Sequence, residues 1–237
     1  MTSKKSTPTG PTVKRTKGVP WILGLVFGLS LFLFCLLTAL EQVAYDADYY
    51  QTFQEENGIV ERTGRTQEEL NQVSKDTIEY LQTGEERLMT DNFQEREVHH
   101  MVDVFELFEL ARLIRLISGI LILLILAYAL YRGEFASLVI SSGKVILVLL
   151  GILVLIAIIG YLNWNTAFTK FHEIFFDNDL WILDPKTDLM IQMMPTPFFT
   201  GMALGIFVRT LVYLLGFYLL AFLIKGRRRG IKTNHAQ

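Results

Sequence analysis

Three histidines lie at positions where proton-transfer chemistry beside a membrane could take place. His99 and His100 precede one long apolar stretch, and His172 follows another. Imidazole titrates near neutral pH and can take up or release a proton during a reaction. A histidine at a membrane boundary most often only packs. Here two separate segments each place one beside aromatic and acidic residues, which favours a paired general acid and base.

A metal site is an alternative use of these residues. Asp103 follows His100 by three positions, so its carboxylate could share the same helix face. Two or three histidines with one aspartate could bind a metal ion, but no recognised metal-ligand spacing is present. His172-Glu173 could begin a zincin helix, but position 176 is Phe where that motif requires a second His. The sequence therefore predicts neither a metal nor a cofactor.

Motifs of other reaction classes are missing from the sequence. It contains no Gly-x-Ser-x-Gly elbow of a serine hydrolase and no glycine-rich phosphate loop. Its tails are basic, which fits membrane topology and attraction to anionic lipids, and nothing indicates nucleic-acid binding. The apolar stretches hold few polar residues and no internal repeat, which argues against a transporter.

The elements that must position the histidines are membrane helices. With 237 residues, 51% of them hydrophobic, the chain is too apolar for an ordinary soluble domain. Spanning the hydrocarbon takes about 20 apolar residues, and lipid leaves backbone groups no partner outside a helix. Four such stretches are Pro20–Gln42, Phe108–Tyr131, Lys144–Leu162 and Phe198–Ile224. The predicted fold class is an all-α membrane protein with four transmembrane helices.

Charge predicts the orientation of these helices. The two tails and the loop after the second helix are basic, and Glu134 is their only acid among the 24 carboxylates of the chain. By the positive-inside rule both termini are cytoplasmic and the other carboxylates lie outside the cell. The first helix is too long for the apolar part of a signal peptide, so we expect a retained anchor. Cys35 lies inside it and is expected to pack rather than react.

These spans divide the chain into nine parts. In order they are a cytoplasmic tail (1–19), a first span (20–42), a first outer segment (43–107), a second span (108–131), a cytoplasmic loop (132–143), a third span (144–162), a second outer segment (163–197), a fourth span (198–224) and a cytoplasmic tail (225–237). We expect the two outer segments to fold together as a mainly helical extracytoplasmic cap.

The first outer segment contains a helix signal. Thr66-Gln-Glu-Glu69 has the pattern of a capping box, and apolar residues then recur at helical spacing. This predicts an amphipathic helix from about Thr66 to Gln82, ended by Gly84. A second helix is predicted to begin near Thr90-Asp91-Asn92 and to run unbroken into the second span.

Three arginines fall within the predicted spans. Arg112 and Arg115 lie near the outer end of the second span, where long side chains reach for the headgroups. Arg209 lies 15 residues before Ile224, about 22 Å along a helix, and so below the outer surface. Intramembrane arginines usually face the bundle interior and are functional candidates. Arg115 lies at a similar depth, so the two cations could face a polar substrate group or share a carboxylate.

Two longer motifs resemble the lipoprotein intramolecular transacylase (Lit) family of Gram-positive bacteria. The first is Glu95-Arg-Glu-Val-His-His-Met-Val-Asp-Val104. The second is Phe171-His-Glu-Ile-Phe-Phe-Asp-Asn-Asp-Leu-Trp-Ile-Leu-Asp-Pro-Lys-Thr-Asp188, followed by Met194-Pro195. The resemblance covers most of the chain, with the motifs at matching membrane junctions. The N-terminal tail and residues 57–64 lie outside it.

The resemblance implies an activity and two catalytic residues. Members of this family move the sn-2 acyl chain of a diacylglyceryl lipoprotein to the α-amino group of its N-terminal cysteine, giving a lyso-form lipoprotein. The motifs place the catalytic pair at His100 and His172, with His172 favoured as the base, while His99 precedes the matching position and is accessory. The implied substrate is a diacylated lipoprotein. We expect the protein to be a multi-pass monomer in the cell membrane, surrounded by membrane lipids, with its active site at the extracytoplasmic face.

Further residues are candidates for orienting the substrate. They are Asp103, Phe171, Trp181, Arg209 and Arg115. The second outer segment is rich in aromatic residues, which fits both an interfacial belt and a water-poor pocket that favours amine attack over hydrolysis. This aromatic set comprises Phe168, Phe171, Phe175, Phe176, Trp181, Phe198 and Phe199.

Two alternatives remain open from the residues alone. A metal-dependent membrane hydrolase would lose its activity to chelators. A non-catalytic membrane scaffold or sensor would keep its function after replacement of both His100 and His172.

Overall fold

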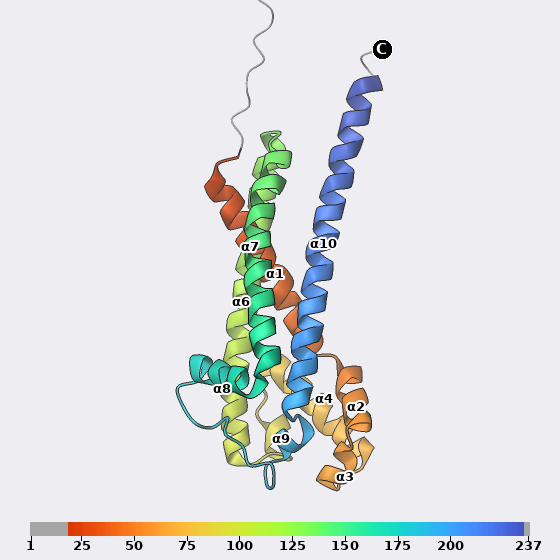
Figure 1. Ribbon diagram of the computed structural model, residues 1–237. Coiled ribbons are helices and arrows are strands. Elements are labelled where there is room, and N and C mark those ends of the chain that lie inside the picture. Colours follow the sequence, from red (N-terminus) through yellow and green to blue (C-terminus); the bar gives the residue numbers. More distant parts are fainter. Residues whose placement is uncertain (1–18, 235–237) are drawn as a thin grey trace, which may run out of the picture.

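The computed structural model describes residues 19–234, and for residues 225–234 it describes the backbone only. The described part of the chain is helical and contains no strand (Figure 1). Its helices are α1 (Trp21–Ala44), α2 (Ala47–Glu56), α3 (Ile59–Thr63), α4 (Gln67–Thr83), α5 (Arg87–Thr90), α6 (Glu95–Tyr131), α7 (Phe135–Leu162), α8 (Trp164–Phe175), α9 (Leu189–Met193) and α10 (Thr196–Asn234).

Four of the described helices are long and apolar enough to cross a membrane. They are α1, α6, α7 and the Thr196–Ile224 part of α10, which confirms the predicted number of spans. The remaining helices gather at one end of these four, whereas the start of α1, the α6–α7 connection and the last turns of α10 lie at the opposite end (Figure 1). Both ends of the described chain are therefore on the same side of the molecule.

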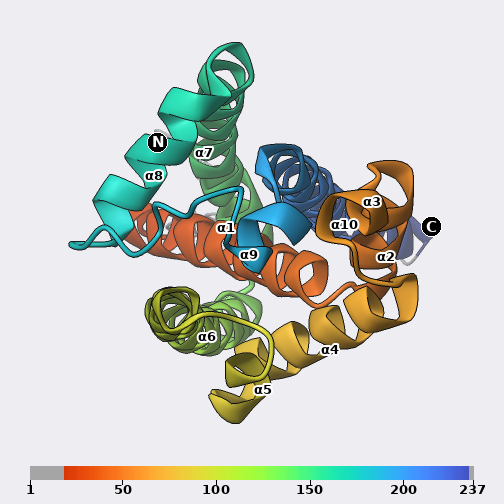
Figure 2. The ribbon, with the colours of Figure 1, turned by 90° about the horizontal axis from the view of Figure 1, so that it is seen from below.

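Helix α1 occupies the centre of the membrane part rather than one corner of a square bundle. It packs against α6, α7 and α10, which touch one another far less (Figure 2). Gly24 and Gly28 permit the close approach to α7, because a β-carbon at either position would collide with Ser141 or Val145. Small residues four apart serve this purpose in membrane helices, where backbones pack closely.

Helix α7 begins at Phe135, before the predicted start of the third span at Lys144. The extra turns contain serines, which are tolerated because their hydroxyls bond backbone carbonyls of the same helix. Ser141 Oγ, for example, donates to the Ser137 carbonyl at 3.0 Å. Ser142 Oγ lies 3.1 Å from the hydroxyl of Tyr218 on α10. The connection from α6 is therefore short, and Gly133 turns it with a positive φ of 71°.

The cap has an apolar core of its own, formed mainly by α2 to α5, α9 and the first turns of α6. The predicted capping box is confirmed: the Thr66 side chain accepts from the Glu69 N–H, and the Glu69 carboxylate accepts from the Thr66 N–H. Helix α4 then runs to Thr83, and Gly84 ends it at φ 75°. A β-carbon on Gly84 would also strike the ring of Phe105.

The predicted start of the next helix near Thr90-Asp91-Asn92 is wrong. Thr90 closes the short helix α5, and its hydroxyl donates to the Arg87 carbonyl at 3.1 Å. Helix α6 starts at Glu95 because Gln94 takes the cap position and pairs with Glu97 in a second capping box. From there α6 runs unbroken into the membrane part, as predicted.

The second outer segment begins with α8, which the Asn163 side chain caps by accepting from the Thr166 N–H at 3.2 Å. A bend follows at Asp177-Asn178-Asp179. The Asp184 N–H donates to Asp188 at 2.7 Å, which organises the turn around Pro185. Helices α6 and α8 thus reach the same end of the molecule from opposite parts of the sequence (Figure 2).

Candidate functional site

His100 and His172 meet in the cap although 72 positions separate them in the sequence. Their ring centroids lie 6.0 Å apart, and each residue is only 7% exposed. Helix α6 supplies His100 from its second turn, and α8 supplies His172 near its end. The neighbouring His99 is exposed, unlike the buried pair. The structure therefore brings together the two histidines that the motifs singled out.

The hydrogen bonding of His172 fixes which ring nitrogen is free. Its Nδ1 lies 2.8 Å from the backbone carbonyl of Phe168, one helical turn earlier. A carbonyl oxygen only accepts, so in the neutral ring Nδ1 carries the hydrogen and Nε2 keeps its lone pair. Burial lowers the pKa of His172, and the bond to Phe168 partly opposes this. His172 is thus a neutral imidazole near pH 7, with Nε2 available as a base.

His100 occupies a drier environment. Burial lowers its pKa to about 4, nearby His172 acts in the same direction, and the carboxylate of Asp103 opposes both. Its Nδ1 is buried and has no hydrogen-bond partner among the described residues. A buried polar atom without a partner is costly and rare in native proteins, and a catalytic role is one of its explanations. His100 therefore offers an uncommitted, uncharged imidazole to whatever enters the site.

Aromatic rings enclose His172. Trp181 stacks on its imidazole with 4.7 Å between centroids, and Phe168 lies at 4.2 Å. Phe171 meets it edge-on at 5.3 Å. Phe176 contacts both histidines, at 5.1 Å from His100 and 5.5 Å from His172. These rings exclude water, which is the physical cause of the lowered pKa of both histidines.

The predicted aromatic set divides between two places. Phe199, in the first turn of α10, reaches Phe168 at 5.7 Å and so borders the site. Phe198 instead packs in the cap core against Tyr49, Tyr50 and Phe53.

Asp103 organises the site through Asn178, which lies in the bend after α8 and was not among the candidate site residues. Its carboxylate accepts from the Asn178 side-chain amide at 2.8 Å. The Asn178 backbone carbonyl in turn accepts from the indole N–H of Trp181 at 3.0 Å, and its side-chain oxygen accepts from the Leu180 N–H. Asp103 therefore ties α6 to the bend that holds Trp181 against His172.

Glu97 is a second residue that sequence reasoning missed. It is fully buried on α6, and its carboxylate accepts from the backbone N–H of Met190 on α9 at 2.7 Å and of Gln94 at 2.8 Å. Burial raises the pKa of this carboxyl, while the two hydrogen bonds oppose that effect. Gln94 and Glu97 have the three-residue spacing of a capping box, which could have predicted the start of α6. Gln is unusual at the first position of this motif, so the pattern is easily missed. Glu97 fixes the start of α6, one turn before His100.

Arg115 and Arg209 lie beside carboxylates at the cap end of α1 rather than beside the histidines. Arg115 pairs with Glu41 of α1, and Arg209 pairs with Asp46, the cap of α2, at 2.9 Å. Each arginine thus pairs with a different carboxylate. The expectation that Arg115 and Arg209 could share one carboxylate, which came from their similar depth along the helices, is not met. Whether either contacts the substrate stays a prediction.

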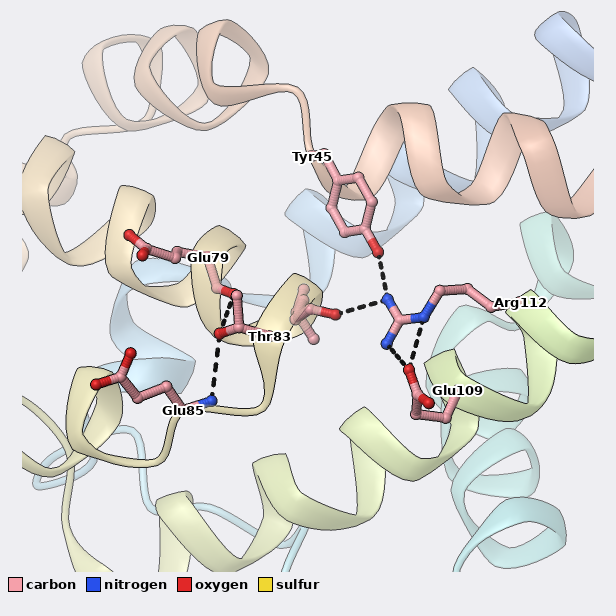
Figure 3. A network of polar contacts seen from close by, with 7 residues as sticks. Tyr45, Glu79, Thr83, Glu85, Glu109 and Arg112 are labelled. Atoms are coloured by element: carbon pink, nitrogen blue, oxygen red, sulfur yellow. Dashed lines mark hydrogen bonds and ion pairs between the residues drawn. The ribbon is translucent and has the colours of Figure 1, made fainter.

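Arg112 is held by the protein instead of extending freely toward headgroups. It donates to the Tyr45 hydroxyl and the Leu81 carbonyl, each at 2.9 Å, and pairs with Glu109 (Figure 3). Leu81 lies in the last turn of α4, where carbonyls without helical partners and the helix dipole favour a cation. Arg112 thereby joins α6 to α4 and to the end of α1, just beneath the cap.

The described residues contain no cluster of three or more His, Cys, Asp or Glu side chains that could hold a metal ion. Asp103 bonds Asn178 and His99 is exposed, so these two do not join His100 and His172 in a ligand set.

Comparisons with known proteins match most of the chain. The family described as "Lipoprotein intramolecular transacylase Lit" matches residues 25–199. The in meso structure of the membrane integral lipoprotein intramolecular transacylase Lit from Bacillus cereus is 23% identical, covers 88% of this chain and 97% of its own, and has a TM-score of 0.76. No curated protein matches the chain by sequence.

Two variants of the Bacillus cereus protein have the same fold. One carries arginine in place of a histidine and is 22% identical, covering 88% of this chain and 93% of its own at a TM-score of 0.74. The other carries alanine in place of a histidine and is 21% identical, covering 91% and 95% at a TM-score of 0.67.

Proposed function

The chain belongs to the lipoprotein intramolecular transacylase (Lit) family, and from this premise we propose that His100 and His172 catalyse acyl transfer within a lipoprotein. The substrate is a lipoprotein whose N-terminal cysteine carries a diacylglyceryl group on sulfur. The sn-2 acyl chain moves from its glycerol oxygen to the α-amino nitrogen of the same cysteine. The product is an N-acyl, lyso-glyceryl lipoprotein of unchanged mass.

The observation that carries this proposal is the pairing of two buried, neutral imidazoles 6.0 Å apart. At this centroid separation, a substrate bound beside the two rings lies within reach of both. Ester aminolysis needs one group to take a proton from the attacking amine and another to donate to the oxyanion. The two histidines match these needs without a covalent enzyme nucleophile.

His172 acts as the base in this scheme. Its Nε2 lone pair, left free by the Nδ1 bond to Phe168, accepts a proton as the amine attacks the ester carbon. The C–N bond forms and the carbonyl oxygen becomes an oxyanion, to which His100 donates a hydrogen bond. Collapse of this intermediate breaks the bond to the glycerol oxygen, which receives the proton from His172. Both imidazoles return to their neutral forms.

Two further features favour transfer over hydrolysis. Nucleophile and ester belong to one molecule, so holding them together replaces a bimolecular encounter and contributes up to about 7–11 kcal/mol. The aromatic rings of Trp181, Phe168 and Phe176 restrict water at the histidines, which limits the competing attack by water.

Mass spectrometry of lipopeptides tests the proposal. The chain is expressed in a bacterium that makes diacylated lipoproteins, and the N-terminal lipopeptide is fragmented. We expect an unchanged total mass, with one acyl chain now on nitrogen. Hydrolysis would instead release a fatty acid and lower the mass.

Histidine variants assign the reaction to the pair. His100→Ala and His172→Ala should each reduce the rate by roughly 10²–10⁴-fold, the usual contribution of a general acid or base. His99→Ala is the matched control, because His99 is adjacent in sequence but exposed. A His172→Ala variant that retains full activity in membranes would refute the role given to that residue.

A further inference from the structure

Helix α8 exposes large apolar side chains although it lies outside the four long helices. Phe171, Ile174 and Phe175 are 48%, 75% and 52% exposed. Residues three and four apart lie on one side of a helix, so these three form a single stripe. A contiguous exposed apolar patch marks contact with lipid or with a partner.

The opposite side of α8 is polar. At about 100° per residue, the polar residues occupy the half of the helix away from the stripe. They are Asn165, Thr166, Thr169, Lys170 and Glu173, and the last two form an ion pair at 2.6 Å. A short helix with one apolar and one polar face is the form that lies in a membrane interface, with its axis in the membrane plane.

The position of α8 identifies lipid as the occupant of its apolar stripe. Figure 1 shows α8 turning sharply from α7 and lying across the direction of the long helices. The surface of α7 that leads into it is apolar and exposed, with Ile158 at 51%, Ile159 at 56% and Leu162 at 76%. The stripe therefore continues a surface that already crosses the membrane.

The buried edge of α8 carries His172. Phe171 contacts the His172 ring edge-on at 5.3 Å while remaining half exposed, so one aromatic ring separates the histidine from the outer surface of α8. Trp181 covers another face of the imidazole. The side of α8 at Phe171 thus provides a short path from the exposed apolar stripe to the paired histidines.

We propose that α8 lies in the outer lipid interface with Phe171, Ile174 and Phe175 among acyl chains, and that the lipid-linked substrate reaches His172 past this edge. The placement of α8 follows from its own surface. The entry route rests in addition on the proposed function.

Spin labels test the placement of α8 without any assay of activity. In a Cys35→Ala background, Ile174→Cys and Glu173→Cys are labelled one at a time in full-length protein in lipid vesicles. The two positions are adjacent and about 100° apart around the helix. We expect the label at 174 to be more accessible to oxygen, which concentrates in lipid, and the label at 173 to a water-soluble nickel chelate. Equal, water-like accessibility at both positions overturns the placement, whether or not the chain is active.

A substrate comparison tests the entry route. Ile174→Glu places a charge on the stripe but does not touch the histidines, and Ile174→Leu is its control. We expect Ile174→Glu to slow the reaction several-fold with a diacylglyceryl lipopeptide in vesicles and to leave it unchanged with the same lipopeptide in detergent micelles. Equal rates for both variants in vesicles overturn the route. Failure of the unaltered chain to act on either form counts against the proposed function, and the spin-label result stands apart from it.

Discussion

At the scale of single residues, the chemistry depends on two imidazoles kept uncharged by burial. His172 has one nitrogen committed to the Phe168 carbonyl, and His100 has a buried nitrogen with no partner in the described part of the chain. In the proposed scheme this asymmetry separates their roles: His172 takes a proton, and His100 donates to the developing oxyanion. The Asp103–Asn178 bond supports this arrangement from the other side of Trp181.

The lowered pKa of His100 is directly measurable. Nuclear magnetic resonance of isotope-labelled histidine in the solubilised protein should give a titration midpoint of about 4, because burial and nearby His172 both disfavour its cation. His172→Ala should raise that midpoint by removing the second effect. A midpoint near the ordinary value of about 6.5 would contradict a dry site.

The same shift sets the direction of a stability change with pH. Above about 6.5 neither the folded nor the unfolded state binds a proton at His100. Between about 6.5 and 4 only the unfolded state does so, because the folded pKa is lowered to about 4. The free energy of unfolding should therefore fall as the pH drops through this window, and the loss should be smaller in His100→Ala.

Asp103 and Asn178 give a second prediction at this scale. Asp103→Ala removes the acceptor of the Asn178 amide, so Trp181 is held less firmly against His172. We expect kcat to fall by about 10–100-fold, as for other small misplacements of catalytic groups, with KM little changed. Asp103→Asn keeps an acceptor oxygen and should restore most of kcat. Equal losses in both variants would indicate that the charge of Asp103, and not its hydrogen bond, is what matters.

Among the helices, the C-terminal end of α1 connects the membrane part to the cap. Tyr45 accepts from Arg112 of α6, Glu41 pairs with Arg115 of α6, and Asp46 pairs with Arg209 of α10. Helices α6 and α10 are thus fixed where α1 leaves the membrane part. Because α6 carries His100 and α10 carries Phe199 beside the site, these contacts also set the distance between the elements that enclose it.

The Arg209–Asp46 pair allows its structural role to be separated from a role in substrate binding. Arg209→Leu should lower the free energy of unfolding by up to about 1 kcal/mol, a modest amount because both side chains are partly exposed. Arg209→Leu combined with Asp46→Asn should recover part of the loss, since no carboxylate is left unpaired and the amide oxygen can still cap α2 by accepting from the Tyr49 N–H. Thermal unfolding in detergent measures both. Activity per folded molecule that stays low in the double variant would support substrate contact by Arg209.

At the scale of the whole molecule, charge and shape divide it into two ends. The cap holds nearly all carboxylates and the paired histidines, and the opposite end holds the α6–α7 connection and the start of α1 (Figure 1). If the basic end faces the cytoplasm, as the positive-inside rule predicts, the histidines lie at the outer membrane surface, where exported lipoproteins carry their lipid.

Thiol labelling tests this orientation. In a Cys35→Ala background, Glu68→Cys on α4 and Arg132→Cys at the α6–α7 connection both replace exposed residues at opposite ends of the molecule. A membrane-impermeant reagent added to intact cells should label position 68 almost completely and position 132 only after the membrane is opened. The reverse pattern would place the histidines on the cytoplasmic side.

Features that depend on local pattern could be read from the amino-acid sequence alone. Apolar length alone specifies a span, because lipid forces backbone groups to bond within a helix, and the four spans follow. The capping residues Thr66 and Glu69 and the positive-φ Gly84 likewise act within a few positions of themselves. The family motifs named His100 and His172 without showing why those two should be chemically coupled.

Only the tertiary structure decided how these parts combine. The central place of α1 brings together helices from different parts of the chain. The ion pairs of Arg115 and Arg209 and the Asp103–Asn178 bond join residues more than 70 positions apart. No periodicity encodes such contacts, because each depends on how several helices pack at once. The start of α6 also depends on the tertiary structure. The helix begins after Gln94 and not at Thr90 because Glu97 accepts from the Gln94 N–H and is held by its bond to the Met190 N–H on α9. Burial of the two imidazoles, which makes them neutral, is likewise a property of the assembled cap.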